Sequence, residues 1–197
     1  MSQLDLIVLS YLLGSIPFSY IITKARTGMD IREMGSKNVG ATNVMRTAGR
    51  AAGILALILD VAKGAAVVLL ARKITGAGSE ALAGFAAMVG HSYPIFLRFR
   101  GGKSVATGGG AFLLISPMAI LCCIATFLGV LAVFRIVSLA SIIAAASFPL
   151  FGWMLGASTT AVLWGALSAA LIIFRHKTNI SHLMQGTERK IGEARNA

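Results

Sequence analysis

The sequence predicts an all-α polytopic membrane protein, from its composition, the length of its apolar segments and the placement of its cations. Of the 197 residues, 56% are hydrophobic and only 13% are charged, whereas a soluble domain carries about 25% charged residues. The apolar segments run for about 17 to 30 residues, so each is long enough to cross a hydrocarbon core of about 30 Å as a helix. A transmembrane barrel would need short strands of alternating polarity instead.

The apolar segments lie at residues 4–23, 51–71, 79–97, 105–134, 136–156 and 158–174. The first has Asp5 where a signal peptide is basic, so we expect it to remain as a spanning helix. The adjacent Cys122 and Cys123 lack metal-ligand spacing and are interpreted as small apolar residues. Because no polar linker divides the chain, we expect a single membrane domain over residues 1–197.

The net charge of +11 comes mainly from three cationic regions, at 24–50, 98–103 and from 175 to the C-terminus. The positive-inside rule places all three in the cytoplasm, with the N-terminus outside the cell and the C-terminus cytoplasmic. Apart from Phe99 between Arg98 and Arg100, aromatic residues do not alternate with these cations. We therefore expect anionic headgroups of the bilayer or an anionic substrate as partners, and no nucleic acid.

Three apolar segments lie between the second and third cationic regions, but an even number of crossings is needed there. Segment 105–134 is the longest and contains Ser116-Pro117. We expect it to divide into two short, tilted helices, which gives about seven transmembrane helices.

The first cationic region contains the stretch MGSKNVGATNVMR. Its glycines let the backbone approach a ligand, and its short polar side chains offer directed hydrogen bonds. We predict that this stretch holds a phosphate and hydroxyl groups, although Ser36 or Thr42 capping the next helix is an alternative. The predicted residues are Ser36, Asn38, Thr42, Asn43 and Arg46.

The stretch RGGKSVATGGG in the second region resembles the end of a nucleotide-binding P-loop. That motif needs a glycine where Leu97 stands and a strand before it, so we exclude it. A glycine-rich turn that leads into a helix still makes an anion site. We predict a phosphate site here, with the helix beginning near Gly108–Gly110, and keep a flexible linker as the alternative. The predicted residues are Gly101, Gly102, Lys103, Ser104 and Thr107.

The third region reads RHKTNISHLMQGTERK. His176 and Asn179 are three residues apart and share a face if the last helix continues. A basic tail that binds headgroups is the alternative. Glu188 stands beside Arg189 and Lys190, and we interpret it as a structural ion partner.

Asp60 and Lys63 lie near the middle of the second apolar segment at spacing i, i+3. Ionisable residues at that depth are costly unless they are paired or hydrated, and this spacing allows them to pair. The pair either fixes helix packing or forms the floor of a water-filled cavity below the polar loops, which we favour. Such charges also suit a small anion or phosphate transporter, but the outer connections are short and plain.

Four motifs in order, GSKNVGATNVMR, LDVAKG, HSYPIFLRFRGGKSVATGG and RHKTNISHLMQGTE, resemble those of the acyl-phosphate-dependent glycerol-3-phosphate acyltransferases, the PlsY family. The chain departs from many members at Lys37 and Ser104, where they have glycine, and at His182, where they have arginine. The resemblance implies seven helices in the bacterial inner membrane, an outside N-terminus and a cytoplasmic active site.

The resemblance also implies the reaction. A fatty acyl group passes from acyl phosphate to the sn-1 hydroxyl of glycerol 3-phosphate and gives lysophosphatidic acid and phosphate, the first acylation of phospholipid synthesis. Neither acyl-CoA nor acyl carrier protein is a direct donor, and no metal or cofactor is needed. A monomer is compatible with the sequence.

Five residues are the predicted catalytic groups of this reaction. Lys103 and Arg46 would stabilise developing negative charge. His176 is the candidate base, with a substrate phosphate as its rival, and Asn179 lies on its face. Ser36 as a covalent nucleophile has no visible partner base, so direct transfer ranks higher.

Overall fold

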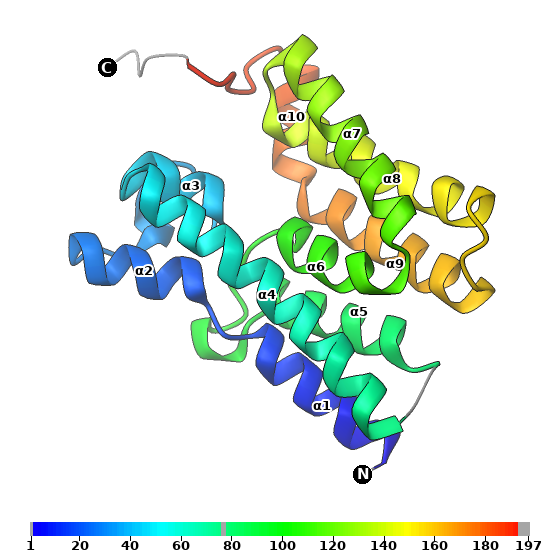
Figure 1. Cartoon of the computed structure of the whole chain (residues 1–197). Coiled ribbons are helices and arrows are strands. Elements are labelled where there is room, and N and C mark those ends of the chain that lie inside the picture. The colour runs from blue at the N-terminus through cyan, green and yellow to red at the C-terminus, as the bar shows by residue number, and fades with distance from the viewer. Residues whose placement is uncertain (1, 76–77, 193–197) are drawn as a thin grey trace. The chain divides into compact units, whose positions relative to one another are not determined.

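The computed structural model describes residues 2–75 and 78–192, and the regular structure in these two ranges is entirely helical (Figure 1). The chain divides into two compact units, Met1–Ile115 and Ser116–Ala197. Unit 1 contains α1 (Gln3–Gly14), α2 (Phe18–Thr27), the 3₁₀ helix η1 (Ile31–Glu33), α3 (Ala41–Thr47), α4 (Arg50–Thr75), α5 (Glu80–Ser92), the 3₁₀ helix η2 (Ile95–Leu97) and α6 (Val105–Ile115). Unit 2 contains α7 (Pro117–Phe134), α8 (Val137–Met154), α9 (Thr159–Arg175) and α10 (Lys177–Met184).

Within the described ranges, 4 helical segments are long and apolar enough to cross a membrane. They are the α1–α2 segment Gln3–Thr27, then α4, α7 and α8. The pair formed by α9 and α10 is bent by 60°, and counting it as one span makes 5. The predicted class, an all-helical membrane protein, is thereby confirmed.

The predicted division of segment 105–134 is also confirmed. α6 ends at Ile115, Ser116 is the N-cap of the next helix, and α7 begins at Pro117. Proline fits this first position because its missing N–H would have no partner there anyway. However, α6 begins at Val105, so the predicted start near Gly108–Gly110 was wrong.

The glycines inside α6 serve its packing against α4. A Cβ at Gly110 would overlap the carbonyl group of Val61, and a Cβ at Gly64 would overlap the carbonyl group of Thr107. Small residues allow such close backbone approach between membrane helices, where the lipid gives no hydrophobic drive for association. The glycine run therefore lies on a helix contact instead of in the turn before the helix.

The first apolar segment is broken, which the sequence analysis did not predict. α1 ends at Gly14 and α2 begins at Phe18, because Pro17 has no N–H and its ring blocks a continuing helix. Carbonyl groups at such a break lose their helical partners. One of them, on Ile16, accepts a hydrogen bond of 3.0 Å from the Lys63 ammonium.

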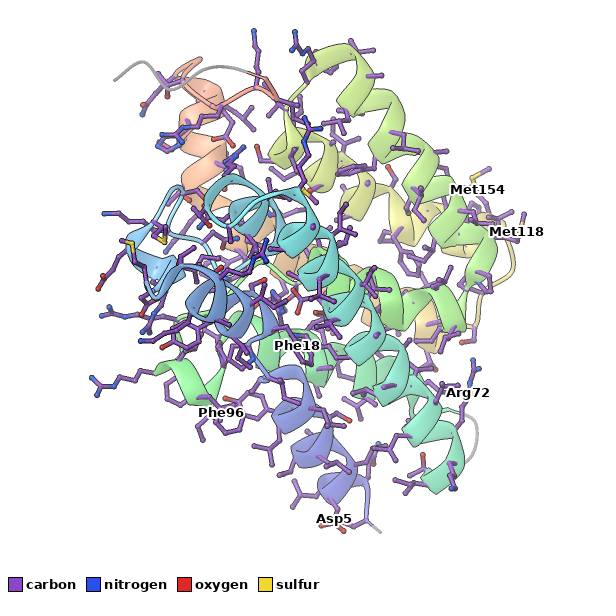
Figure 2. All side chains as sticks on the ribbon, turned by 60° about the vertical axis from the view of Figure 1, so that its left-hand side comes forward. Asp5, Phe18, Arg72, Phe96, Met118 and Met154 are labelled. Carbon is purple, nitrogen blue, oxygen red and sulfur yellow. The ribbon has the colours of Figure 1, made fainter. Side chains whose placement is uncertain are left out.

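Lys63 lies in a buried network of three ionisable side chains. Its Nζ is 2.8 Å from Asp60 Oδ1 and 2.8 Å from His91 Nδ1. The exposed fractions are 2% for Asp60, 7% for Lys63 and 8% for His91. The network thus connects α4, α5 and the break after α1, and Figure 2 shows Phe18 at this break.

The predicted cavity beside the pair is small. A space of about 10 Å³ is lined by residues that include Pro17, Asp60, Lys63 and His91. That volume holds about one water molecule. The network therefore packs helices together, and the space that the structure shows beside it is smaller than a substrate site. The water-filled cavity that we favoured from the sequence stays a prediction.

We expect Asp60→Ala to lower the free energy of unfolding by about 3–5 kcal/mol, because it leaves the Lys63 ammonium buried without its carboxylate. The double variant Asp60→Leu/Lys63→Met removes both charges and should regain part of this loss. Thermal unfolding of the purified variants in one detergent measures both. Equal loss in the two variants would contradict a pairing role.

Candidate functional site

Two polar loops of unit 1 pack directly against each other. We name residues 28–40, between α2 and α3, the first loop, and residues 98–104, between η2 and α6, the second loop. A Cβ at Gly102 would overlap both the Val39 carbonyl oxygen of the first loop and the His91 imidazole of α5. The Gly102 N–H donates to the His91 carbonyl at 3.0 Å. Only glycine fits this junction without displacing one of the two loops.

An apolar cluster lies beneath the two loops and fixes them. Its buried members are Ile31, Val39, Val44, Ala52, Ala56 and Leu97. The Arg32 guanidinium reinforces this contact, because it donates to the Leu97 carbonyl at 3.2 Å and lies 2.6 Å from Asp30 Oδ2. These hydrogen bonds from Arg32 hold the pKa of the Asp30 carboxyl below its ordinary value. The Asp30 carboxylate therefore stays ionised at neutral pH, and its ion pair with Arg32 stays intact.

Asn43 shapes the first loop from within. Its Oδ1 accepts from the Ser36 N–H at 2.9 Å, and its Nδ2 lies 3.0 Å from both the Met34 and the Asn38 carbonyl oxygens. The side chain is only 1% exposed. We therefore correct its predicted role: its amide holds the loop in shape and is not placed to contact a phosphate.

The remaining predicted residues of this stretch are more accessible. Ser36, Thr42 and Arg46 are exposed and Asn38 is half-buried. The N-cap of α3 is Gly40, without a side-chain cap, so the alternative interpretation of Ser36 or Thr42 as a cap was wrong. Thr42 and Arg46 are one turn apart on α3 and share a face.

In the second loop, Ser104 is turned toward α5. Its φ of 60° is left-handed, and its hydroxyl donates to the Met88 carbonyl at 2.6 Å. The Ser92 hydroxyl lies 2.6 Å away, and it is the donor because the Ser104 proton is already committed. The hydroxyl of Ser104 therefore fastens the loop to α5, which replaces the predicted phosphate contact.

Two further predicted residues of this loop region are buried. Gly101 packs against the Pro94 ring and the His91 carbonyl. Thr107 lies within α6, and its buried hydroxyl makes no hydrogen bond to the described residues. Among the five predicted residues here, Lys103 is the one with a partly exposed side chain. Lys103 is thus partly accessible between buried neighbours that hold the loop in place.

In unit 2, His176 lies at the bend between α9 and α10 and is buried. The predicted continuous helix is therefore interrupted at this residue. His176 Nδ1 is 2.8 Å from the Ile172 carbonyl oxygen. Because a carbonyl only accepts, the ring proton is assigned to Nδ1, and Nε2 is the basic nitrogen of the neutral imidazole.

Glu188 holds Asn179. Its Oε1 accepts from Asn179 Nδ2 at 2.6 Å and from the Ser138 hydroxyl at 2.7 Å, and its Oε2 is 3.4 Å from His182 Nδ1. The described contacts of Glu188 are with Asn179, Ser138 and His182, while its predicted pairing with Arg189 and Lys190 stays a prediction. The Asn179 amide nitrogen faces the Glu188 carboxylate. The Asn179 Oδ1 therefore faces away from that carboxylate.

Sequence reasoning missed His91, although it lies in the apolar segment 79–97. An ionisable residue at such a position was a usable signal, because it needs partners at membrane depth. Arg32 and Ser92 were missed as well. Nothing in the local sequence of either residue indicates its partner, since Leu97 and Ser104 are reached only by tertiary contacts.

The chain is similar to known proteins in both sequence and structure. The family model described as glycerol-3-phosphate acyltransferase matches residues 4–186. The glycerol-3-phosphate acyltransferase of Desulforamulus reducens is 43% identical over 95% of this chain and 94% of its own length. That of Desulforudis audaxviator is 46% identical over 91% of each chain.

Solved structures give the same result. The crystal structure of PlsY, an integral membrane glycerol 3-phosphate acyltransferase, in its glycerol 3-phosphate form is 42% identical, with a TM-score of 0.92 over 98% of this chain and 96% of that one. The lysophosphatidic acid form is 40% identical, with a TM-score of 0.89 over the same shares. On this similarity over nearly its whole length, the chain belongs to the glycerol-3-phosphate acyltransferase family.

Proposed function

We propose that this chain transfers a fatty acyl group from acyl phosphate to the sn-1 hydroxyl of glycerol 3-phosphate, the first acylation of phospholipid synthesis. The products are lysophosphatidic acid and phosphate. PlsY, its structural relative, was solved in forms with the substrate and with the product of such an acylation. The observation in this chain that carries the proposal is the packing of Gly102 against Val39, which joins the loop that contains Lys103 to the loop that contains Ser36 and Asn38.

Family membership favours the enzyme over the anion transporter that intramembrane charges also suggested. The Asp60–Lys63 pair is closed off by His91 and the Ile16 carbonyl. A permeation path would need these charges to line a hydrated route, and the space beside them is about 10 Å³.

We place the protein in the bacterial inner membrane, with seven membrane helices, the N-terminus outside and the C-terminus in the cytoplasm. The contacts of Arg72 support alternating passes in unit 1. Its side chain bonds Glu80 Oε1 at 3.3 Å and the Leu114 carbonyl at 2.6 Å, so α4 ends where α5 begins and α6 ends. The α1–α2 segment, α4, α5 and α6 then supply four passes, and α7, α8 and α9 supply three.

We further propose that both compact units form one acyltransferase domain. The family model runs from residue 4 to residue 186, and so includes helices of each unit. Neither unit alone contains all the motifs that the family match covers.

In the proposed reaction, the hydroxyl oxygen of glycerol 3-phosphate attacks the acyl carbonyl carbon. The bond from that carbon to the phosphate oxygen breaks, and phosphate leaves. Lys103 and Arg46 stabilise the negative charge on the carbonyl and the departing phosphate, while Ser36, Asn38 and Thr42 hydrogen-bond the phosphate and glycerol oxygens. Holding two reactants in line supplies roughly 7–11 kcal/mol of the barrier, which suits a donor that is already activated.

The hydroxyl proton passes to His176 Nε2 or to a substrate phosphate. The Nδ1–H bond to the Ile172 carbonyl sets the tautomer in which Nε2 accepts. Asn179 orients the hydroxyl through its Oδ1. The Glu188 carboxylate fixes the direction of this Oδ1, because it accepts a hydrogen bond from the Asn179 amide nitrogen. We rank direct transfer above an acyl-serine, because the described hydrogen bond of Ser36 is made by its N–H to Asn43 Oδ1, and no base of unit 1 is described bonding its hydroxyl.

Purified chain in proteoliposomes is expected to form lysophosphatidic acid and phosphate in equal amounts from acyl phosphate and glycerol 3-phosphate. Acyl-CoA in place of acyl phosphate should give no product. Radiolabelled glycerol 3-phosphate, thin-layer separation and a phosphate assay measure both products. Phosphate flux across the vesicles without product would instead support the transporter.

Lys103→Ala is expected to lower kcat/KM by about 10²–10³-fold, because it removes a charge that stabilises the transition state. The purified variant should keep the thermal unfolding midpoint of the parent chain. Lys73 is an exposed lysine in the last turn of α4, and Lys73→Ala is the matched control. This control variant should retain full activity. Unchanged kinetics for both substrates in Lys103→Ala would refute the assignment.

Glu188→Ala is expected to lower kcat about 10²-fold, since a side chain misplaced by about 1 Å costs that much. Glu188→Gln keeps an oxygen that accepts from Asn179 and Ser138, so it should retain most of the rate. Exposed Glu33→Ala controls for loss of charge alone. If the Gln and Ala variants were equally impaired, positioning of Asn179 would not be the role of Glu188.

A further inference from the structure

The segment that follows α5 and runs into the start of the second loop has an unusual surface. We name residues 94–100 the aromatic turn, because it presents exposed apolar side chains outside any α-helix. Ile95 is 48% exposed, Phe96 is 61% and Phe99 is 58%. Figure 2 shows Phe96 on η2, at the edge of unit 1. Three large apolar side chains clustered on one short turn mark an interaction surface.

Several backbone N–H groups of the aromatic turn are hydrogen-bonded within the turn itself, which suits a site with little water. The N–H groups of Leu97 and Phe99 both bond the Pro94 carbonyl, at 3.1 and 2.9 Å. Arg98 bonds the Ile95 carbonyl at 3.3 Å, and Arg100 bonds the Leu97 carbonyl at 3.2 Å. Four N–H groups of the turn are thus paired within it, which suits a turn beside hydrocarbon, because unpaired N–H groups there are costly.

The aromatic turn is also held in one orientation. Arg98 and Phe99 have φ of 54° and 61°, left-handed values that side chains adopt only at an energetic cost. Between the exposed side chains, Leu97 points inward to the apolar cluster with Ile31, and Arg32 donates to its carbonyl at 3.2 Å. The fold thus maintains a strained turn that keeps two phenylalanine rings outside.

Cations flank the exposed rings. Arg98 and Arg100 are both exposed, and Lys103 follows in the second loop. Aromatic rings beside arginines are typical of the boundary between headgroups and acyl chains, where rings enter the lipid and cations meet phosphate. The charge and apolarity of the turn together match an anionic phospholipid surface.

We propose that the aromatic turn inserts Ile95, Phe96 and Phe99 into the headgroup–acyl boundary, while Arg98 and Arg100 bind phosphates of anionic phospholipids. The insertion fixes the depth of Lys103 in the membrane surface. This consequence rests on the proposed function: acyl phosphate carries its phosphate at the same boundary, so the turn sets Lys103 at the level of the donor's phosphate. Glycerol 3-phosphate arrives from water and does not depend on that depth.

The insertion is tested without any activity measurement. A nitroxide label is placed at Phe96→Cys or Phe99→Cys in a Cys122→Ala/Cys123→Ala chain, in nanodiscs of phosphatidylcholine with or without phosphatidylglycerol. Collisions with oxygen should exceed those with a water-soluble nickel chelate, as for Leu128→Cys on the apolar helix α7. Lys37→Cys, exposed in the first loop, should show the opposite. Labels at 96 and 99 that behave like Lys37→Cys would overturn the insertion.

The lipid composition tests the arginines. With phosphatidylglycerol present, the label at 99 should move deeper, and Arg98→Gln/Arg100→Gln should abolish that shift. A depth independent of phosphatidylglycerol in the parent chain would overturn the phosphate contacts.

The effect on catalysis is tested with Phe96→Ser/Phe99→Ser. Its KM for long-chain acyl phosphate in nanodiscs should rise about tenfold or more, because two apolar side chains leave the lipid. Its KM for glycerol 3-phosphate should stay unchanged. Phe134→Ser, which alters a ring of similar exposure (51%) at the end of α7, should change neither constant.

An equal rise of both constants would reduce the turn to a folding role and overturn the proposal. If the parent chain did not use acyl phosphate at all, the proposed function would fail, while the depth measurement would still decide the insertion.

Discussion

The Lys63 ammonium is the contact on which the arrangement of unit 1 depends. It has three hydrogens and three neighbours: the Asp60 carboxylate, the His91 imidazole and the Ile16 carbonyl. In a membrane interior each of these groups would otherwise be desolvated without compensation, at a cost of several kcal/mol. Because the three neighbours belong to α4, α5 and the break after α1, one side chain fixes three segments.

The same network reaches the functional loops. His91 accepts the Gly102 N–H through its carbonyl, and its ring forms one wall of the space where Gly102 fits. The Val39 carbonyl of the first loop forms the other wall. A buried charge near the middle of α4 therefore supports the junction that places Lys103.

Backbone shape explains the two loop positions at which a departure from the resembled family was expected. Lys37 and Ser104 have left-handed φ values of 58° and 60°. Glycine adopts this conformation without a Cβ penalty. In this chain Ser104 offsets the penalty by its bonds to Met88 and Ser92. At these positions the left-handed loop backbone favours glycine. The departures leave the accessible side chains of the site intact.

The sequence predicted the parts of the fold that local chemistry decides. Composition gave the membrane class, and Ser116-Pro117 marked the boundary between α6 and α7 because proline acts on its own helix. Pro17 acts in the same way, but a long apolar run around it suggested an unbroken span. The candidate loops were also visible, since glycines and short polar residues stand out among apolar segments.

Which residues of those loops face outward was not visible from the sequence. Asn43 and Ser104 resemble ligand-binding residues by type, yet their hydrogen bonds are used by Met34, Asn38 and Met88. Such assignments depend on contacts between residues that lie 5 to 16 positions apart, at spacings that no regular helix pattern predicts. The same holds for Glu188, whose contact with Asn179 fixes an amide that the sequence placed only by helical spacing.

The proposed chemistry explains why some polar residues hold the loops in shape while others remain accessible. An acyl phosphate already carries a good leaving group, so the protein needs no strong nucleophile, and placement supplies most of the rate. Placement requires loops that do not relax when charge develops, because preorganised donors act without reorganisation at the moment of reaction. A polar loop at a membrane surface becomes rigid only when most of its polar groups bond to the protein itself. Asn43, Ser104 and Gly102 are used in this way, so that Lys103 stays accessible on a backbone that has little freedom left.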